Sequence, residues 1–182
     1  LQQISIFDQY DIEEFTSAHF PLLKLLYKNA FNTDVRIEEI ESRFNTNALG
    51  GPVIGFIAIH KQTQVPSAYY GVFPFKAIIK DEIVQAAQSG DTMTHSHHRR
   101  KGLFATLANL TYEKCKELGI KILIGQPNES SYHGLVKTLG WEHIDEIIRW
   151  DLKLKLKTFP LQKLPVLIWD FKNIILTIQK QY

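Results

Sequence analysis

The stretch Thr92-Met93-Thr94-His95-Ser96-His97-His98-Arg99-Arg100-Lys101-Gly102-Leu103-Phe104 decides the fold, because it joins a predicted strand to a predicted helix. The strand before it covers residues 83–89 and ends at Gly90-Asp91, a pair typical of turns. The helix after it ends at Gly119, and one of its faces carries Leu103, Leu107, Leu110 and Leu118. The stretch therefore lies where the carboxyl end of a strand meets the start of a helix.

Three further strands surround this unit. Residues 120–125 are short, apolar and flanked by turn residues, so we expect a buried strand there. A strand, a helix and a strand in this order predict a parallel pair joined by the helix. The extended runs 53–60 and 67–75 are separated by a short polar segment, which fits a β-hairpin.

The N-terminal segment predicts a short strand and two helices. Ile4-Ser5-Ile6 alternates as a strand does. A helix follows whose apolar residues, spaced three to four apart, form one stripe of Phe15, Leu22, Leu23, Leu26, Ala30 and Phe31. Asp34 is predicted to cap a second, shorter helix that runs to about Phe44.

The end of the chain has two predicted parts. Residues 151–157 alternate between leucine and charged residues, as a strand with one apolar face would. Residues 166–179 are apolar enough for a helix that packs on its own domain, with a dimer contact or another domain's interface as the alternatives. We therefore expect one domain over residues 1–157 and a C-terminal helical tail over residues 158–182.

Composition narrows the class of protein. The chain has 182 residues, of which 45% are hydrophobic and 22% charged, as is typical of one globular domain. Aromatic residues make up 12% and the net charge is only +2, which excludes global disorder. Cys115 is the single cysteine, so a disulfide scaffold is excluded. The lone thiol and the lack of an apolar leader predict a cytoplasmic location, and no apolar run is long enough for a membrane span.

The segment Arg99-Arg100-Lys101-Gly102-Leu103-Phe104 predicts an anion site. Backbone N–H groups at a helix start have no partners within the helix, and the helix dipole adds positive charge there. Gly102 lets the backbone approach a ligand closely, and the three basic residues add charge for phosphates. The P-loop and dinucleotide fingerprints both need further glycines that this segment lacks.

These residues resemble the GNAT superfamily of N-acetyltransferases. Its acetyl-CoA motif is Arg or Gln, two residues, Gly, one residue, then Gly or Ala, and Arg99, Gly102 and Phe104 take the fixed positions. Phe104 departs from the commonest choice, but a residue in the first helical turn needs no positive φ. Gln126-Pro127-Asn128 and Leu139-Gly140-Trp141, which is similar to the family's Leu-Gly-Phe, continue the resemblance in the right order.

The resemblance implies an α/β fold with a mixed, twisted β-sheet flanked by helices, in which the fourth and fifth strands splay apart. The pantetheine arm of acetyl-CoA, the co-substrate, would lie between those strands. By position, Met93 and Thr94 would offer backbone groups to the arm, and Asn128 would hydrogen-bond it or start the next helix. The pyrophosphate would be held by Arg99, Arg100, Lys101, Gly102, Leu103 and Phe104.

The activity that the resemblance implies is transfer of an acetyl group to a small-molecule amine, or to a sugar amine or hydroxyl, by direct attack on the thioester. It implies no metal. We expect a small-molecule acceptor as partner, with no nucleic acid and no membrane, and a homodimer is left open.

The residues that would carry the proton transfers are less clear from the sequence. In many relatives a tyrosine four residues before the glycine of Leu-Gly-Phe protonates the departing thiolate, and here that position is Val136. Tyr132 and His133, one turn earlier, are the substitutes, although Tyr132 fits an ordinary packing role as well. His95 is the best candidate base, because it ends the strand that presents the thioester; a strand-end histidine without chemistry is the alternative.

Four other residues are weaker candidates for the site. Asp91 and Glu82 are possible bases, but Asp91 after Gly90 more often makes a turn. Tyr69 and Tyr70 point to opposite faces of a neighbouring strand, so one could line an acceptor cleft while the other belongs to the core.

Three other functions are weighed against the transferase. The imidazoles of His95-Ser96-His97-His98 could bind zinc, but adjacent histidines diverge on an extended chain. Nucleic-acid binding would need aromatic residues among the basic ones, and the sequence pI near 8.6 is mild. An acyl-CoA-binding module without transfer activity is kept open by Val136.

Overall fold

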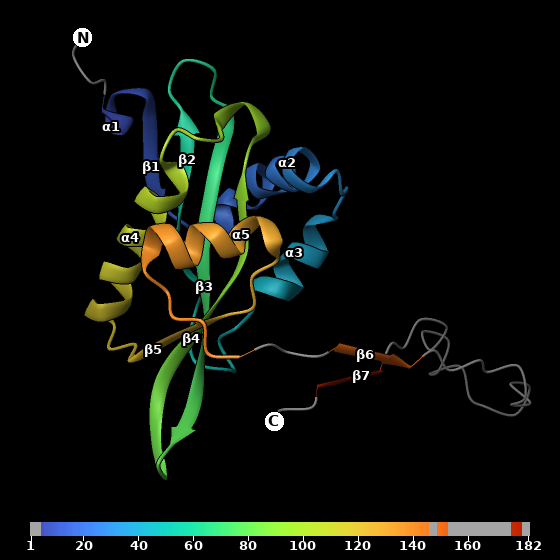
Figure 1. Cartoon of the computed structure of the whole chain (residues 1–182). Coiled ribbons are helices and arrows are strands. Elements are labelled where there is room, and N and C mark those ends of the chain that lie inside the picture. Colours follow the sequence, from blue (N-terminus) through green and yellow to red (C-terminus); the bar gives the residue numbers. More distant parts are fainter. Residues whose placement is uncertain (1–4, 146–148, 153–175, 180–182) are drawn as a thin grey trace, which may run out of the picture. The chain divides into compact units, whose positions relative to one another are not determined.

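The computed structural model describes residues 5–145, 149–152 and 176–179 of the chain. The chain divides into two compact units, Leu1–Trp141 and Glu142–Tyr182, each of which is described by itself (Figure 1). The predicted boundary at residue 157 lies outside the described residues.

The described strands of the first unit form a five-stranded sheet in the order β1-β2-β3-β4-β5. The four pairs are antiparallel except for β4 and β5, which are parallel. The mixed sheet and its parallel pair are therefore confirmed. The strands are β1 (Tyr10–Glu14), β2 (Ile54–His60), β3 (Pro66–Ile79), β4 (Glu82–Thr94) and β5 (Ile122–Gly125).

Helices cover both faces of this sheet. Figure 1 shows α2 and α3 over one face and α4 and α5 over the other. The helices are α1 (Ile6–Gln9), α2 (Phe20–Phe31), α3 (Ile37–Phe44), α4 (Leu103–Glu117) and α5 (Glu129–His133). A 3-10 turn at Ser96–His98 follows β4, and a single π-helical turn at Gly134–Thr138 continues α5.

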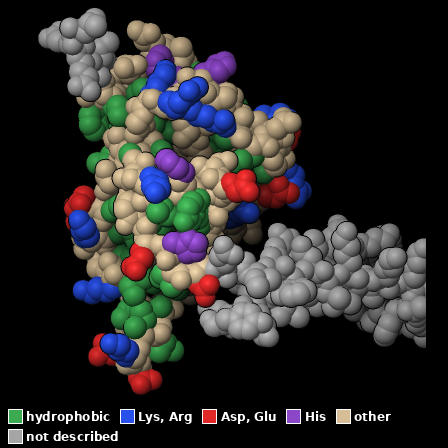
Figure 2. All heavy atoms as spheres, viewed as in Figure 1, with side chains coloured by type: hydrophobic (Ala, Val, Ile, Leu, Met, Phe, Trp, Pro, Cys, Tyr) green, Lys and Arg blue, Asp and Glu red, His purple; other side chains and the backbone are tan. Residues whose placement is uncertain are grey.

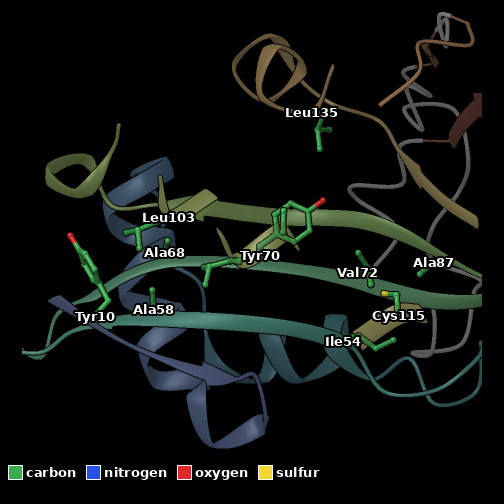
Figure 3. Close-up of a cluster of buried hydrophobic side chains, with 12 residues drawn as sticks. Tyr10, Ile54, Ala58, Ala68, Tyr70, Val72, Ala87, Leu103, Cys115 and Leu135 are labelled. Carbon is green, nitrogen blue, oxygen red and sulfur yellow. The ribbon is translucent and has the colours of Figure 1, made fainter. Parts of the chain in front are cut away.

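Side chains that alternate along the strands form a separate core on each face of the sheet. Tyr70 belongs to the core beneath α4 (Figure 3), with Tyr10, Ile54, Ala58, Ala68, Val72, Ala87, Leu103, Leu107, Ala108, Cys115 and Leu135. Tyr69 belongs to the core beneath α2 and α3, with Phe15, Leu23, Leu26, Tyr27, Ile40, Phe44, Ile57 and Met93. The two tyrosines point to opposite faces as predicted, and both are buried.

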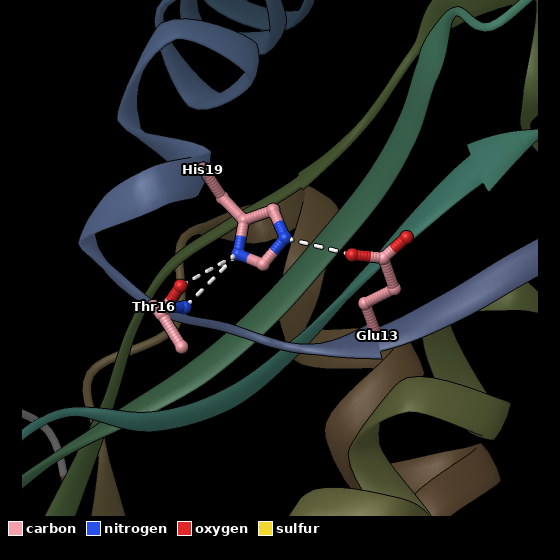
Figure 4. Close-up of polar contacts among 3 residues, drawn as sticks. All are labelled: Glu13, Thr16 and His19. Carbon is pink, nitrogen blue, oxygen red and sulfur yellow. Dashed lines mark hydrogen bonds and ion pairs between the residues drawn. The ribbon is translucent and has the colours of Figure 1, made fainter.

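A polar network fixes the start of α2 to the end of β1. His19 Nδ1 accepts the backbone N–H of Thr16 at 3.0 Å, so the ring proton lies on Nε2 and is donated to the Glu13 carboxylate at 2.9 Å (Figure 4). These contacts set the direction in which α2 leaves the sheet. The last two residues of α2, Ala30 and Phe31, line a cleft at the edge of this sheet.

The N-terminal elements lie differently from the sequence prediction. Ser5 caps α1, with its N–H donated to the Asp8 carboxylate at 2.9 Å, so the short strand predicted at residues 4–6 is wrong. The first strand is β1, and Phe15 follows it instead of opening a helix. The second helix begins at Ile37, three residues after Asp34, because the Glu39 carboxylate accepts the N–H of Arg36 at 3.0 Å.

The hairpin of β2 and β3 is confirmed, and a second, longer hairpin joins β3 to β4. Its two-residue turn, Lys80-Asp81, has φ values of 49° and 67°, as hairpin turns require. The strand expected within residues 120–125 is confirmed as β5, but its expected burial is wrong, because among the described strands β5 has a neighbour on one side only. Its Ile122 and Ile124 are 37% and 41% exposed.

In the second unit, β6 (Arg149–Leu152) pairs antiparallel with β7 (Leu176–Gln179). The helix predicted over residues 166–179 is wrong at its end, since the last four of these residues form β7. The start of the strand predicted over 151–157 falls in β6, and the rest of both segments lies outside the described residues.

Candidate functional site

The parallel strands β4 and β5 separate at one end, and a cleft lies where they do. Their pairing ends at Ser89 and Gly125, but β4 continues to Thr94. A cleft of about 830 Å³ is lined by residues from both sides of this separation. Its volume lies in the range typical of small-molecule sites. The splayed fourth and fifth strands are therefore present.

β4 carries a bulge where it borders the cleft. Between the pairs Tyr69–Met93 and Gly71–Gly90, β4 holds one residue more than β3. Asp91 lies in this bulge with a left-handed φ of 54°. The predicted end of the strand at Gly90-Asp91 is therefore wrong: aspartate tolerates the left-handed conformation in bulges as it does in turns.

The predicted anion site lies at the start of α4. Gly102 precedes the helix with a φ of 82°, and no side chain caps the helix at that point. The N–H groups of the first helical turn are therefore left for a ligand, at the positive end of the helix dipole. Arg99 Nε donates to the carbonyl of Thr94 at 3.4 Å, which ties the turn to the end of β4.

Most of the predicted cofactor residues line this one cleft. Those that do are Met93, Thr94, Arg99, Arg100, Gly102, Leu103, Phe104 and Asn128. Lys101 is exposed and does not belong to the lining. Figure 2 shows lysine, arginine and histidine side chains gathered at the upper end of the sheet, where β4 ends. The lining also includes Ala105 and His98, which the motif did not point to.

His98 is braced from the first strand. Its Nδ1 lies 2.8 Å from the Tyr10 hydroxyl, and its ring lies 5.2 Å from that of His60 and 5.3 Å from that of His95. Burial, together with the nearby charge of Lys101 and the other imidazoles, lowers the pKa of His98 to about 4. His98 is therefore neutral at pH 7 and supports the turn.

His95 follows β4 directly but lies outside the lining of the cleft. Its Nδ1 accepts the N–H of His97 at 3.3 Å, and its own N–H donates to the carbonyl of Ser67 at 2.9 Å. Burial and then the charges of His97 and Arg99 lower the pKa of His95. The neutral ring therefore carries its proton on Nε2.

Asn128 starts α5 and borders the cleft. Its side chain accepts the N–H of Ser131 at 3.0 Å, so of its two predicted roles the structure shows the start of the helix. Tyr132, on the same helix, is 39% exposed and does not line the cleft. Val136 lies in the π-helical turn that follows.

A chain of hydroxyl groups connects the Leu-Gly-Trp segment to the cleft. Trp141 Nε1 donates to the Tyr112 hydroxyl at 2.8 Å. The Tyr112 hydroxyl in turn lies 2.8 Å from the Tyr70 hydroxyl. The Ser89 hydroxyl, in the lining, donates to Tyr70 at 3.0 Å. A Cβ on Gly125 would lie 2.9 Å from the Trp141 ring, so the end of β5 requires glycine here. Tyr70 thus supports the cleft from below, and neither it nor its neighbour on β3 lines the cleft.

The other end of the cleft lies beside α2. Ala30 and Phe31, its last two residues, belong to the lining, as does Asp91, the acidic residue among the described lining residues. The Asp91 side chain is 19% exposed, and Arg43 Nη1 donates to its Oδ1 at 2.9 Å. Burial raises the pKa of Asp91 above its usual value, against the opposing effects of Arg43 and Tyr27. A carboxylate with a raised pKa in a cleft is suited to accepting a proton.

No group of three or more His, Cys, Asp or Glu side chains is arranged to hold a metal ion in the part of the chain that the structure describes. Within the same residues, none of the helices combines the length and the apolar character needed to cross a lipid bilayer.

Many solved structures share this fold, and three of them serve as examples. A glucosamine-6-phosphate N-acetyltransferase from Arabidopsis thaliana is 16% identical, with a TM-score of 0.61 over 78% of this chain and 97% of that one. A Trypanosoma brucei acetyltransferase is 16% identical, with a TM-score of 0.62 over 79% and 99%. An aminoglycoside acetyltransferase from an uncultured soil metagenomic sample, in complex with sisomicin, is 14% identical, with a TM-score of 0.61 over 83% and 100%.

The sequence itself gives a family assignment. No curated protein matches the chain by sequence. The family model described as an acetyltransferase (GNAT) domain matches residues 11–144, which include the five-stranded sheet except Tyr10, the turn after β4 and all described residues of the cleft lining. The chain belongs to the GNAT acetyltransferase family.

Proposed function

We propose that this chain transfers the acetyl group of acetyl-CoA to the primary amine of a small molecule, with an amino sugar as the favoured acceptor class and a sugar hydroxyl as the variant. One observation carries the proposal: a single cleft joins the uncapped start of α4 to the half-buried carboxylate of Asp91. The structural neighbours named for glucosamine-6-phosphate and aminoglycoside acetylation support the acceptor class.

The cofactor half of the cleft offers backbone groups and positive charge. In the proposal, the N–H groups at the start of α4 and the side chains of Arg99 and Arg100 hold the pyrophosphate. Met93 and Thr94, on the unpaired part of β4, offer backbone groups to the pantetheine arm and the thioester carbonyl. A backbone N–H aimed at the developing oxyanion contributes about 3 kcal/mol.

The reaction itself asks for position and for one proton acceptor. The amine nitrogen forms a bond to the thioester carbon, the carbon–sulfur bond breaks, and the amine loses a proton. Holding the two reactants together supplies about 7–11 kcal/mol of the barrier. An amine with a pKa near ~10 is protonated at neutral pH, so a base must take its proton.

We propose Asp91 as that base in preference to His95. Asp91 lines the cleft and His95 does not. The one lone pair on the neutral His95 ring, at Nδ1, already accepts the N–H of His97. His95 remains the base that the sequence predicts. The activities of the variants His95→Gln and Asp91→Asn decide between the two candidates. Loss of activity in His95→Gln alone would return the role to the histidine.

The departing thiolate needs a proton. Tyr132 stays the predicted donor, and Tyr132→Phe tests it by the expected fall in kcat. Val136, at the position of the usual tyrosine, favours the second candidate function, an acyl-CoA-binding module without transfer. Binding of acetyl-CoA with no thiol release on any amine would single out that module.

We further propose a cytoplasmic protein with a small-molecule partner, with a homodimer left as a prediction. Cys115 is buried, and burial raises the pKa of its thiol to about 11, so it is an unreactive core residue.

Thermal unfolding with acetyl-CoA, CoA and ADP tests the cofactor first. A ligand at one hundred times its dissociation constant adds about 2.7 kcal/mol, which raises Tm by roughly 5–10 °C for a chain of this length. Gly102→Glu should abolish the shift. Gly119→Glu is the matched control, because Gly119 also has a positive φ of 74° but lies after the other end of α4. No shift with either CoA species would overturn the proposal.

Turnover is then measured by thiol release with glucosamine 6-phosphate, an aminoglycoside and a plain alkylamine. Release with an amino sugar supports the acceptor class. Release with the alkylamine alone would overturn that class and keep the transferase.

A further inference from the structure

Three side chains that are far apart in the sequence meet at the acceptor end of the cleft. Arg43 Nη1, on α3, donates to Asp91 Oδ1 of β4 at 2.9 Å and to the hydroxyl oxygen of Tyr27 of α2 at 3.1 Å. One nitrogen thus bridges the carboxylate and the phenol. Arg43 thereby connects both helices that cover this face of the sheet to Asp91, the acidic side chain among the described residues of the cleft lining.

The directions of these hydrogen bonds follow from the chemistry of the groups. A guanidinium only donates, so the oxygen of Tyr27 accepts from Arg43 and its own O–H is free to donate. Burial raises the pKa of Tyr27 to about 12, so this proton is kept throughout the working range of pH. Hydrogen bonding by Tyr27 lowers the pKa of Asp91, as does the charge of Arg43. Both partners therefore favour the ionised carboxylate.

The arrangement is poorly suited to a purely structural role. The Arg43 side chain is 56% exposed, and ion pairs of that exposure contribute about 0–1 kcal/mol to stability. Asp91 also lies in a left-handed bulge, which aspartate adopts less readily than glycine. A carboxylate held at such a position, with a raised pKa, contributes little to stability and more to the chemistry of the cleft.

The charged and titratable groups around Asp91 come from every element packed on it. They are Tyr27 from α2, Arg43 from α3 and Tyr69 from β3. The Tyr69 hydroxyl is fully buried without a hydrogen-bond partner, and its pKa lies well above the usual value. It stays neutral, so Arg43 is the one cation in this set.

We propose that Arg43 and Tyr27 are positioning residues for acetyl transfer: Arg43 holds Oδ1 of Asp91, Tyr27 holds the Arg43 guanidinium, and the carboxylate takes the proton of the acceptor amine. The inference rests on the proposed function. In the step, Asp91 takes a proton from the ammonium, which gives the nitrogen a lone pair; the carbon–nitrogen bond then forms, the carbon–sulfur bond breaks, and the second proton lost by the nitrogen passes to the departing thiolate. Arg43 and Tyr27 touch neither substrate and act only through the carboxylate.

The first test needs no substrate. The side-chain carboxyl carbons of aspartate are labelled with ¹³C, and their NMR shifts are followed against pH, with Asp91→Asn identifying the resonance. Arg43→Gln and Tyr27→Phe should each raise the titration midpoint of Asp91, by about 1 pH unit for the arginine. Arg43→Lys should restore part of that shift because it keeps the charge. Arg36→Gln is the matched control, since Arg36 pairs with Glu39 at the start of the same helix.

The second test uses the enzyme with the acceptor found by thiol release. The acid limb of the profile of kcat/KM against pH should move upward in Arg43→Gln and Tyr27→Phe by the shift that NMR gives, with the KM for acetyl-CoA unchanged. An unmoved Asp91 midpoint in both variants would overturn the inference, as would an unmoved acid limb. A moved midpoint in a protein that acetylates no amine would overturn the proposed function and leave the contacts with Asp91 established.

Discussion

The ring of Phe104 occupies the space that a side chain at Gly134 would need. A Cβ on Gly134 would lie 2.9 Å from Cε1 of Phe104, and the same ring meets Tyr70 edge-on with centroids 5.6 Å apart. Phe104 is the residue at which the turn departs from the small residue usual in the family. The glycine after α5 thus accommodates the larger side chain.

Gly134→Ala should therefore destabilise the fold by about 1–3 kcal/mol, as overpacking does. Gly134 has a helical φ of −65°, where alanine would otherwise stabilise by about 1 kcal/mol. Phe104→Leu should remove most of the penalty. Urea unfolding of the wild type, both single variants and the double variant gives the coupling free energy between residues 104 and 134. Equal effects of Gly134→Ala in both backgrounds would show that the ring is not the cause.

His98 should make the stability of the fold depend on pH. Its pKa is about 4 in the folded protein against an ordinary value of 6.5, so the unfolded chain takes up a proton first as the pH falls. The stabilisation is fully present above pH 6.5 and is lost progressively toward pH 4. His98→Gln should flatten the fall in Tm between pH 7 and pH 5.

The control for this titration is His97→Gln, an exposed histidine in the same turn. It should leave the pH dependence of Tm as in the wild type. A profile for His98→Gln that is as steep as that of the wild type would count against the assignment.

Asp91→Asn should separate activity from stability. Because burial raises the pKa of Asp91 in the folded protein, its contribution favours folding at low pH and is lost as the pH rises through the folded pKa. Asparagine carries no charge, so the destabilisation caused by ionising a buried carboxyl at pH 7 is removed and Tm should rise. The rate of thiol release should fall by a factor of about 10²–10⁴, because the proton acceptor is lost. Asp81→Asn is the control, since Asp81 also has a positive φ, of 67°, but lies in the hairpin turn. A lower Tm with activity retained would contradict the assignment.

Asn29→Ala should weaken the binding of CoA. The Asn29 side chain accepts the N–H of Ser96 at 2.7 Å, which ties α2 to the turn that follows β4. Loss of this bond leaves the backbone N–H of Ser96 without its partner. We expect this to cost about 1 kcal/mol, which corresponds to a several-fold increase in the dissociation constant for CoA. Isothermal titration with CoA measures it, and Lys28→Ala on the same helix is the exposed control. Unchanged affinity would show that the turn holds its shape without α2.

The turn that opens α4 could be predicted from sequence because its residues are contiguous. Arg99 to Phe104 form one turn and the start of one helix, so local rules about helix ends and glycine suffice to describe them. The order of the elements could be predicted for the same reason, since each hairpin and helix carries its own pattern. Boundaries failed where a cap decided them, as at Ser5 and Arg36.

The acceptor half could not be predicted, because its contacts are not local. Arg43 lies 16 residues from Tyr27 and 48 from Asp91, and no pattern in the sequence pairs them. Gly90-Asp91 also has the composition of a turn. It forms a bulge because the residues before and after it in β4 both pair with β3. The sequence prediction therefore ranked His95 above Asp91, whereas the lining of the cleft makes Asp91 the proposed base.

One turn of α2 reaches both halves of the cleft: Tyr27 contacts Arg43, and Asn29, two residues later, bonds the turn after β4. In the proposed reaction, the two substrates would therefore share the support of this helix. Thermodynamic linkage makes such a coupling reciprocal. If bound cofactor changes the affinity for the acceptor through this helix, the bound acceptor must change the affinity for the cofactor by the same factor. Variants of α2 would alter this mutual factor without touching either molecule.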